Sequence, residues 1–118
     1  MTGLPSSARV LVLGLTFKEN CPDLRNTRVV DIVSELTTYG STVDVHDPWV
    51  NPEEAKSAYG IDLVEEPDAG AYDAILIAVG HRQFAALGAG GIRRFGKPSS
   101  LVYDIKYVLP QGAADDRL

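Results

Sequence analysis

Two cations and an acid follow the first apolar run of the chain, which covers residues 9–14. Lys18, Asp23 and Arg25 lie close together where a strand would pass into a helix. Arginine offers a planar fork that binds a phosphate or carboxylate through two hydrogen bonds, and lysine adds a mobile positive charge. A helix that begins just beyond them would contribute its dipole and its free N–H groups. The segment therefore predicts an anion site; the alternative is a solvated loop whose charges pair with Glu19 and Asp23.

His81 is a further candidate because it follows the apolar run at residues 72–80, and ligands of parallel sheets bind at strand ends. It would either face a ligand there or cap the helix that follows. Cys21 has no base beside it in the sequence, so we do not expect it to be a nucleophile. The His-Asp-Pro-Trp segment at residues 46–49 predicts a strand-ending turn fixed by its proline; the alternative places His46 or Asp47 in the ligand cleft. We expect Trp49 to cover the edge of the domain or to pack against another domain rather than to stack on a base. The His, Cys, Asp and Glu residues lack metal-ligand spacing, so no metal is predicted.

Length, charge and cysteine content exclude several classes of protein. A chain of 118 residues suits one domain, and its net charge of -5 gives no overall positive field for nucleic acid. One cysteine permits no internal disulfide, which is typical of a reducing compartment. The start, MTGLPSSA, lacks the apolar core of a signal peptide, and no apolar run approaches the ~20 residues that span a bilayer. We therefore expect a cytoplasmic protein with neither a nucleic-acid nor a membrane partner.

Hydrophobic spacing predicts strands that alternate with helices. The strands are predicted at residues 9–14, 42–47, 61–65 (short and weak), 72–80 and 100–106. The helices are predicted from a cap at Asn26 or Thr27 to Gly40, at 52–59 and, broken by glycines, at 82–96. Such alternation predicts right-handed crossovers and a parallel sheet with helices on both faces. The fold class is therefore α/β, a three-layer Rossmann-like domain with a mostly parallel sheet of about five strands.

The domain is predicted to cover residues 9–110. Residues 1–8 are rich in Gly, Pro and Ser, and we expect them to be a linker or a start introduced by cloning. Residues 111–118 are expected to form a polar C-terminal tail.

The first strand invites a dinucleotide site, but the sequence after it does not support one. The fingerprint G-x-G-x-x-G uses its later glycines to let the pyrophosphate and the helix approach closely. Here Gly14 is followed by Leu-Thr-Phe-Lys, so the pattern fails after one glycine. We therefore expect no NAD site in this domain and interpret Gly14 as a strand-end residue.

The order F-K-x-x-x-x-D-x-R after LGLT, then a helix, then VDVHDPWV resembles the C-terminal domain of the nucleotide-sugar 6-dehydrogenases. This family acts on UDP-glucose, UDP-N-acetylhexosamines and GDP-mannose, and the resemblance covers about residues 9–118. The segments GLTFKENCPDLRNTRVVDIV, DPWVNPEEAK, VGHRQF and YDIKYVLP look most like one branch. That branch makes UDP-N-acetylhexosaminuronic acids for bacterial surface polysaccharides.

The resemblance implies that the full-length enzyme oxidises the sugar C6 alcohol to a carboxylate with NAD⁺. The NAD would be bound by an N-terminal domain absent from this chain, and a central helical domain would form a homodimer or larger assembly. The family's catalytic thiol also lies outside this stretch, so we expect no catalytic residue here and no activity of the chain alone.

The resemblance further assigns substrate-binding roles to residues of the opening loop. Phe17 and Lys18 begin the nucleotide-facing part, and Arg25 is the arginine that reaches the UDP-sugar, in some members from a neighbouring subunit. Asp23 matches the motif acid, whose expected role is to hold the loop or Arg25. His81, from its place at a strand end, completes the set of substrate-binding candidates.

Two other classes of function remain open from the sequence. One is a stand-alone regulatory module that binds a nucleotide or NAD. The other is a non-catalytic interaction domain whose cationic loop is merely solvated.

Overall fold

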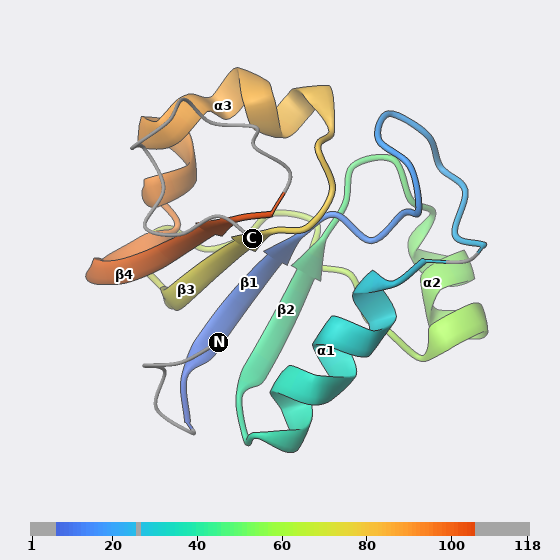
Figure 1. Cartoon of the computed structure of the whole chain (residues 1–118), viewed down its shortest axis with the longest axis horizontal. Coiled ribbons are helices and arrows are strands. Elements are labelled where there is room, and N and C mark those ends of the chain that lie inside the picture. Colours follow the sequence, from blue (N-terminus) through green and yellow to red (C-terminus); the bar gives the residue numbers. More distant parts are fainter. Residues whose placement is uncertain (1–6, 26, 106–118) are drawn as a thin grey trace.

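The structure is a computed structural model that describes residues 7–25 and 27–105, and the account below concerns these residues. The elements, in chain order, are β1 (Arg9–Leu13), α1 (Val29–Thr38), β2 (Thr42–His46), α2 (Pro52–Tyr59), β3 (Tyr72–Ile77), α3 (Arg82–Arg93) and β4 (Gly96–Asp104). The four strands form one parallel sheet in the order β2-β1-β3-β4 (Figure 1).

The side chains of each central strand alternate between two apolar layers. On β1, Val12 packs in the cluster that contains Leu36 of α1, whereas its neighbour Leu13 packs with Phe84 of α3. The alternation follows from the two-residue period of a strand, and burial on both faces explains the continuous apolar runs of β1 and β3. The predicted α/β, three-layer Rossmann-like fold with a parallel sheet is confirmed.

The order of the strands creates a switch point between β1 and β3. The chain leaves β1 toward α1 and β2 on one side, and later leaves β3 toward α3 and β4 on the other. Loops that diverge in this way leave a crevice at the carboxyl ends of the strands, where ligands of open parallel sheets bind. The fold therefore places the loop that follows β1 at the position expected of a binding site.

The predicted count of about five strands is wrong, because the sheet formed by residues 7–25 and 27–105 has four. The segment predicted as a weak strand at residues 61–65 makes a single parallel bridge, between Leu63 and Val45. Gly60, with φ +69°, ends α2 just before it, and Pro67, which has no N–H, follows soon after. Too few residues remain between these two to extend the pairing along β2.

The predicted helices are confirmed, with small shifts at their ends. α1 begins at Val29, whose N–H donates to the Thr27 hydroxyl at 3.2 Å; Asn26 lies outside the described residues. α2 occupies residues 52–59 as predicted, and α3 is interrupted at Gly88, where φ is +66°. The last strand begins earlier than predicted, at Gly96, through a register irregularity opposite β3, and Lys106 at its predicted end lies outside the described residues.

Charged and aromatic side chains pair with one another at the amino end of the sheet. The Tyr72 hydroxyl donates to Asp44 at 2.7 Å, and Arg9 lies over the Tyr72 ring, 4.9 Å from its centroid. Burial, and then the bond to Asp44, raises the pKa of Tyr72 to about 12. Asp73 accepts from the Arg9 backbone N–H and from Lys97. These contacts lie at the end of the sheet opposite the switch-point loops.

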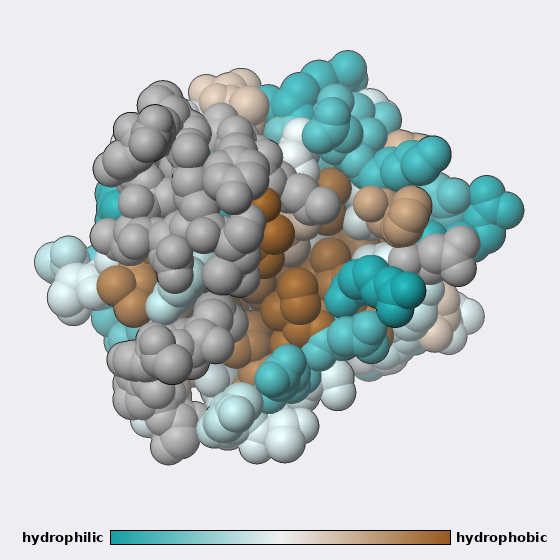
Figure 2. All heavy atoms as spheres, in the orientation of Figure 1, coloured by the Kyte–Doolittle hydropathy of each residue, from teal (hydrophilic) through white to brown (hydrophobic). Residues whose placement is uncertain are grey.

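Apolar side chains also gather on the face shown in Figure 2, next to α1 and in front of the sheet. Half-buried members of this cluster include Val30, Val33 and Val43.

None of the helices among the described residues has the length and apolar character needed to cross a membrane.

Gly14 allows β1 and β3 to approach each other where the opening loop begins, and this can be tested. Its φ is +102°, and a Cβ there would lie 2.5 Å from Cβ of Val79 and 2.9 Å from the Val79 nitrogen. We expect Gly14→Ala to lower the free energy of unfolding by about 3 kcal/mol, from left-handed strain together with overpacking. Denaturant unfolding measures the change.

Gly60→Ala is the matched control, because Gly60 also has a positive φ, +69°, but a Cβ there meets nothing within 4 Å. Only the backbone strain applies, so the expected loss is about 1 kcal/mol. Equal losses in the two variants would show that the contact with Val79 does not constrain the strand ends.

Candidate functional site

The loop that joins β1 to α1 crosses the carboxyl ends of the strands and presents the predicted substrate-binding residues (Figure 1). Phe17 is 49% exposed, and Lys18 and Arg25 are also exposed. Leu24, in contrast, is buried in the core beneath the loop. The loop folds back on itself, because the Phe17 N–H donates to the Asp23 carbonyl at 3.3 Å. Buried apolar contacts therefore fix the loop from below, and its charged residues face outward.

A buried carboxylate, that of Asp47, organises the start of this loop. Its Oδ2 accepts hydrogen bonds from the backbone N–H groups of Leu15 at 2.7 Å and Thr16 at 3.3 Å, and from Nε2 of His81 at 2.9 Å. Its Oδ1 accepts from the Trp49 N–H at 2.8 Å. Burial by itself would raise the pKa of Asp47, but the bonds from His81, Leu15 and Trp49 outweigh it and leave the pKa lowered.

His81 lies beneath the loop with its side chain completely buried. Its Nδ1 accepts the backbone N–H of Asn20 at 2.8 Å, so the ring hydrogen is on Nε2, which donates to Asp47. The Thr16 hydroxyl, 3.2 Å from Nε2, donates to the Lys18 carbonyl. The predicted role of His81 as a direct substrate contact stays a prediction; here both of its ring nitrogens bind protein groups.

Asn20 links the loop to the start of α3. It has a left-handed backbone, with φ of 55°, and its Oδ1 accepts the Arg82 N–H at 2.7 Å. The side chain of His81, at the cap position of α3, makes no capping bond to the helix. Asn20 thus accepts the hydrogen bond of a free N–H at the start of α3, which is the capping role predicted as one alternative for His81.

Trp49 covers the same corner of the domain, as predicted from the turn at residues 46–49. Its indole N–H donates to Oε1 of Gln83 at 2.9 Å. The guanidinium of Arg82 lies over its ring at 4.9 Å from the centroid. These contacts join the turn that follows β2 to the first turn of α3.

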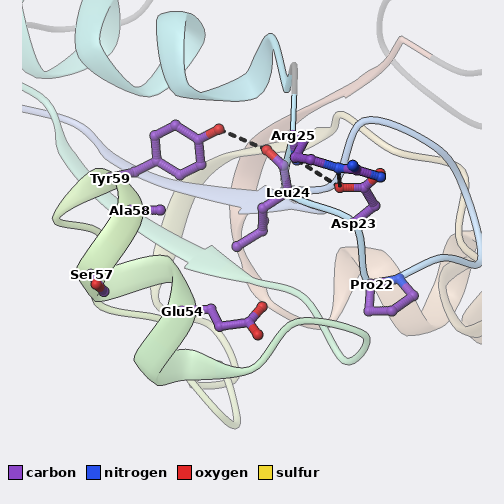
Figure 3. Close-up of a pocket in the computed structure, with 8 residues that line it drawn as sticks. All are labelled: Pro22, Asp23, Leu24, Arg25, Glu54, Ser57, Ala58 and Tyr59. Carbon is purple, nitrogen blue, oxygen red and sulfur yellow. Dashed lines mark hydrogen bonds and ion pairs between the residues drawn. The ribbon is translucent and has the colours of Figure 1, made fainter.

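Asp23 holds the guanidinium of Arg25 through two parallel hydrogen bonds (Figure 3). Nε of Arg25 donates to Oδ1 and Nη2 to Oδ2, each at 3.0 Å, and the Arg25 backbone N–H also donates to Oδ1 at 2.9 Å. The bonds from Arg25, with a contribution from the positive charge of Lys18, lower the pKa of Asp23. The side chain of Arg25 nevertheless remains 87% exposed. The contact that the motif implied for Asp23 and Arg25 is therefore present.

A groove with a volume of about 370 Å³ separates this part of the loop from α2 (Figure 3). Its lining residues are Pro22, Asp23, Leu24, Arg25, Glu54, Ser57, Ala58 and Tyr59. The Tyr59 hydroxyl closes one end by donating to the Leu24 carbonyl at 2.7 Å. Because the lining holds two acids and one cation, the groove itself does not favour a phosphate. Lys18, the other exposed cation of the loop, is not among the residues that line the groove.

Sequence reasoning missed Thr16 and Asn20, and it considered Asp47 only as a residue of the ligand cleft, not as an organiser of the loop. An Asp-Pro pair directly after a strand was a usable signal for Asp47, because an aspartate side chain there commonly bonds the backbone two residues on, as Asp47 does to Trp49. Cys21 is half-buried in the loop. Among the residues that the structure describes, no group of three or more His, Cys, Asp and Glu side chains is placed to hold a metal ion.

Replacing the Asp47 carboxylate should destabilise the domain in a pH-dependent way. Asp47→Asn places an amide among the four donors that the carboxylate satisfies, so we expect the free energy of unfolding at neutral pH to fall by about 3 kcal/mol. Because the pKa of Asp47 is lowered by folding, its stabilisation is complete above about pH 4 and is lost as the pH falls through the folded-state value. Urea unfolding at several pH values should therefore show the two proteins converging in acid.

Asp62→Asn is the control for this measurement, because Asp62 pairs with Lys56 at the surface with 82% of its side chain exposed. Its expected effect is below about 0.5 kcal/mol. A constant difference between wild type and Asp47→Asn down to the lowest pH would contradict the assignment of Asp47 as an ionised, buried acceptor.

Comparisons with known proteins place this geometry in a family. Residues 11–111 match the family model described as the UDP-glucose/GDP-mannose dehydrogenase family, UDP binding domain. Two relatives are UDP-N-acetyl-D-glucosamine 6-dehydrogenases. The chain is 57% identical to the one from Pseudomonas aeruginosa, over 94% of this chain and 26% of the relative. It is 55% identical to the one from Salmonella typhi, over 92% of this chain and 26% of the relative.

Solved structures show the same fold. The UDP-D-ManNAc dehydrogenase from Pyrococcus horikoshii aligns with a TM-score of 0.74 at 22% identity, over 96% of this chain and 25% of that chain. A UDP-glucose dehydrogenase from Pyrobaculum islandicum aligns with a TM-score of 0.68 at 29% identity, over 94% and 24%. The chain spans about a quarter of the length of these relatives. The resemblance found in the sequence is confirmed, and the chain belongs to the UDP-glucose/GDP-mannose dehydrogenase family as its UDP-binding domain.

Proposed function

We propose that this chain binds the UDP part of a UDP-sugar with Phe17, Lys18 and Arg25. The observation that carries the proposal is the exposed guanidinium of Arg25, held by Asp23 on a loop at the strand ends of a domain of this family. Lys18 lies close enough to the same carboxylate to affect its pKa. A guanidinium held in place and a second, mobile positive charge suit the binding of a diphosphate.

The guanidinium retains donors for a ligand after binding Asp23. Of the five N–H donors of an arginine, one on Nε and one on Nη2 point to Asp23. Three donors remain, and they are open to solvent because 87% of the Arg25 side chain is exposed. Phe17, half exposed beside Lys18, supplies an apolar surface suited to a base or ribose.

We further propose that the whole protein is an NAD-dependent UDP-N-acetylhexosamine 6-dehydrogenase that makes uronates for polysaccharides. The names and the 57% and 55% identities of the two relatives support this substrate class. This domain would fix the nucleotide, so that binding energy far from C6 positions that carbon for oxidation elsewhere in the enzyme. We propose that the enzyme is cytoplasmic, acts as a homodimer or larger assembly, and is inactive as this chain alone.

The residues of this chain do not fit NAD, and the proposal gives the dinucleotide to another part of the enzyme. In a dinucleotide-binding fold the N–H groups after the first strand approach the pyrophosphate. Here the N–H groups of Leu15 and Thr16 bind the Asp47 carboxylate instead. A buried negative charge at this place would repel a pyrophosphate. This geometry argues against the alternative of a stand-alone NAD-binding module.

Calorimetric titration of the chain with UDP at low salt tests the proposal. We expect wild type to bind UDP, and Arg25→Ala or Lys18→Ala to weaken binding by about tenfold each, as for the loss of one charge-assisted hydrogen bond. Added salt should weaken binding by the wild type, because the contacts are exposed. NAD⁺ should give no measurable binding.

Lys97→Ala is the matched control, because Lys97 also forms an exposed ion pair with an aspartate, Asp73, but at the opposite edge of the sheet. It removes the same charge, so an effect of net charge alone would appear in both variants. Unchanged affinity in Arg25→Ala would remove Arg25 from the site. Absence of UDP binding by the wild type would favour an interaction domain.

A further inference from the structure

The buried ionisable pair of Asp47 and His81 has no direct part in the proposed contacts to UDP. Both side chains are completely buried, and Nε2 of His81 lies 2.9 Å from Oδ2 of Asp47. Asp47 follows β2, and His81 precedes α3, so the pair joins the two sides of the switch point. The rings of Phe84 and Trp49 pack beside His81, with centroids 5.5 and 6.2 Å away.

The His81 ring accepts a hydrogen bond at Nδ1 and donates one at Nε2. The backbone N–H of Asn20 donates to Nδ1 of His81, and Nε2 of the same ring donates to Asp47. A neutral ring with its hydrogen on Nε2 satisfies both contacts. A hydrogen on Nδ1 would face the N–H of Asn20 and remove that contact. The observed arrangement therefore requires one tautomer of His81.

These bonds hold both ends of the exposed segment that carries Phe17 and Lys18. At one end, Thr16 binds Asp47 through its N–H and lies 3.2 Å from Nε2 of His81 through its hydroxyl. At the other end, Asn20 binds Nδ1 of His81 and, through its side chain, the first turn of α3. The positions of the exposed residues are thus determined by buried groups that a ligand does not reach in this arrangement.

We propose that His81 is a positioning residue for nucleotide binding, which holds Phe17 and Lys18 in place through Asn20 while Asp47 fixes its tautomer. This proposal rests on the proposed function for the identity of the ligand, UDP. In this proposal His81 does not contact the substrate but fixes the position of the loop. It acts on the loop through its hydrogen bond to Asn20.

Two measurements on the unmodified chain without ligand test the hydrogen bonds of His81 to Asn20 and Asp47: the tautomer of the His81 ring and the rate of amide hydrogen exchange in the loop. Long-range ¹H–¹⁵N correlation of the His81 ring should show a single hydrogen, on Nε2, at neutral pH. Amide hydrogen exchange should be slower at Asn20 than at its exposed neighbour Glu19. A hydrogen on Nδ1, or equal exchange at the two amides, would overturn the proposal whether or not UDP binds.

Two amide substitutions of His81 distinguish a role in positioning the loop from a role in packing alone. In His81→Asn the side-chain oxygen can occupy the place of Nδ1 and accept from Asn20, whereas in His81→Gln the side-chain nitrogen can occupy the place of Nε2 and donate to Asp47. Both lose the ring. We expect His81→Gln to lose the protection of the Asn20 amide and about tenfold in UDP affinity, and His81→Asn to retain most of both.

Equal loss of UDP affinity in the two variants, or full affinity in His81→Gln with an unprotected Asn20 amide, would contradict positioning through Asn20. Failure of the wild type to bind UDP would instead refute the proposed function. The tautomer and exchange measurements would still decide whether His81 holds the loop through Asn20, and they do not depend on the folding of any variant.

Discussion

The site depends on one buried carboxylate. Asp47 accepts two backbone N–H groups from the start of the opening loop, one from the turn that follows its own strand, and the ring of His81. An unpaired buried charge would be strongly unfavourable, so these donors must be in place whenever the carboxylate is ionised. The loop, the β2 turn and the start of α3 therefore cannot move independently of one another.

The sheet explains why these three segments meet. In the order β2-β1-β3-β4, with every strand parallel, the ends of β2, β1 and β3 lie side by side. The paired residues Leu13 and His46, and Leu13 and Ile77, bring the three strand ends to one level. Gly14 then lets the chain turn immediately beside Val79. A dinucleotide-binding fold uses this place for a phosphate, and here a side chain of the domain itself occupies the same donors.

Much of the fold could be predicted from the sequence, because its signals are local. Asn51 and Pro52 mark the start of α2, and the Asn51 side chain accepts the Glu53 N–H as an N-cap should. The segment at residues 61–65 misled the prediction, since β-propensity says nothing of how many residues can pair with a neighbour. Only Leu63 forms a bridge.

The candidate site was predictable only in its local part. Asp23 and Arg25 are two residues apart, so their pairing could be inferred from the motif. Asp47 and His81 are 34 residues apart, and Asn20 and His81 are 61 apart. No spacing rule connects such residues; the sheet order brings them together. The sequence pointed to the exposed residues of the loop and to His81 at a strand end, but it could not show that Asp47, His81 and Asn20 meet beneath the loop.

The pairing of Arg25 with Asp23 has a consequence for the entropy of association. A free arginine side chain on a surface loses much rotational freedom when it grips a ligand, and this loss subtracts from affinity. Here the two parallel bonds to Asp23 restrict the side chain before any ligand arrives, although it is 87% exposed. The ordering is done during folding, so a phosphate bound as proposed would meet a guanidinium that is already oriented. A lysine at this position would keep the charge but not the planar fork, and the advantage would disappear.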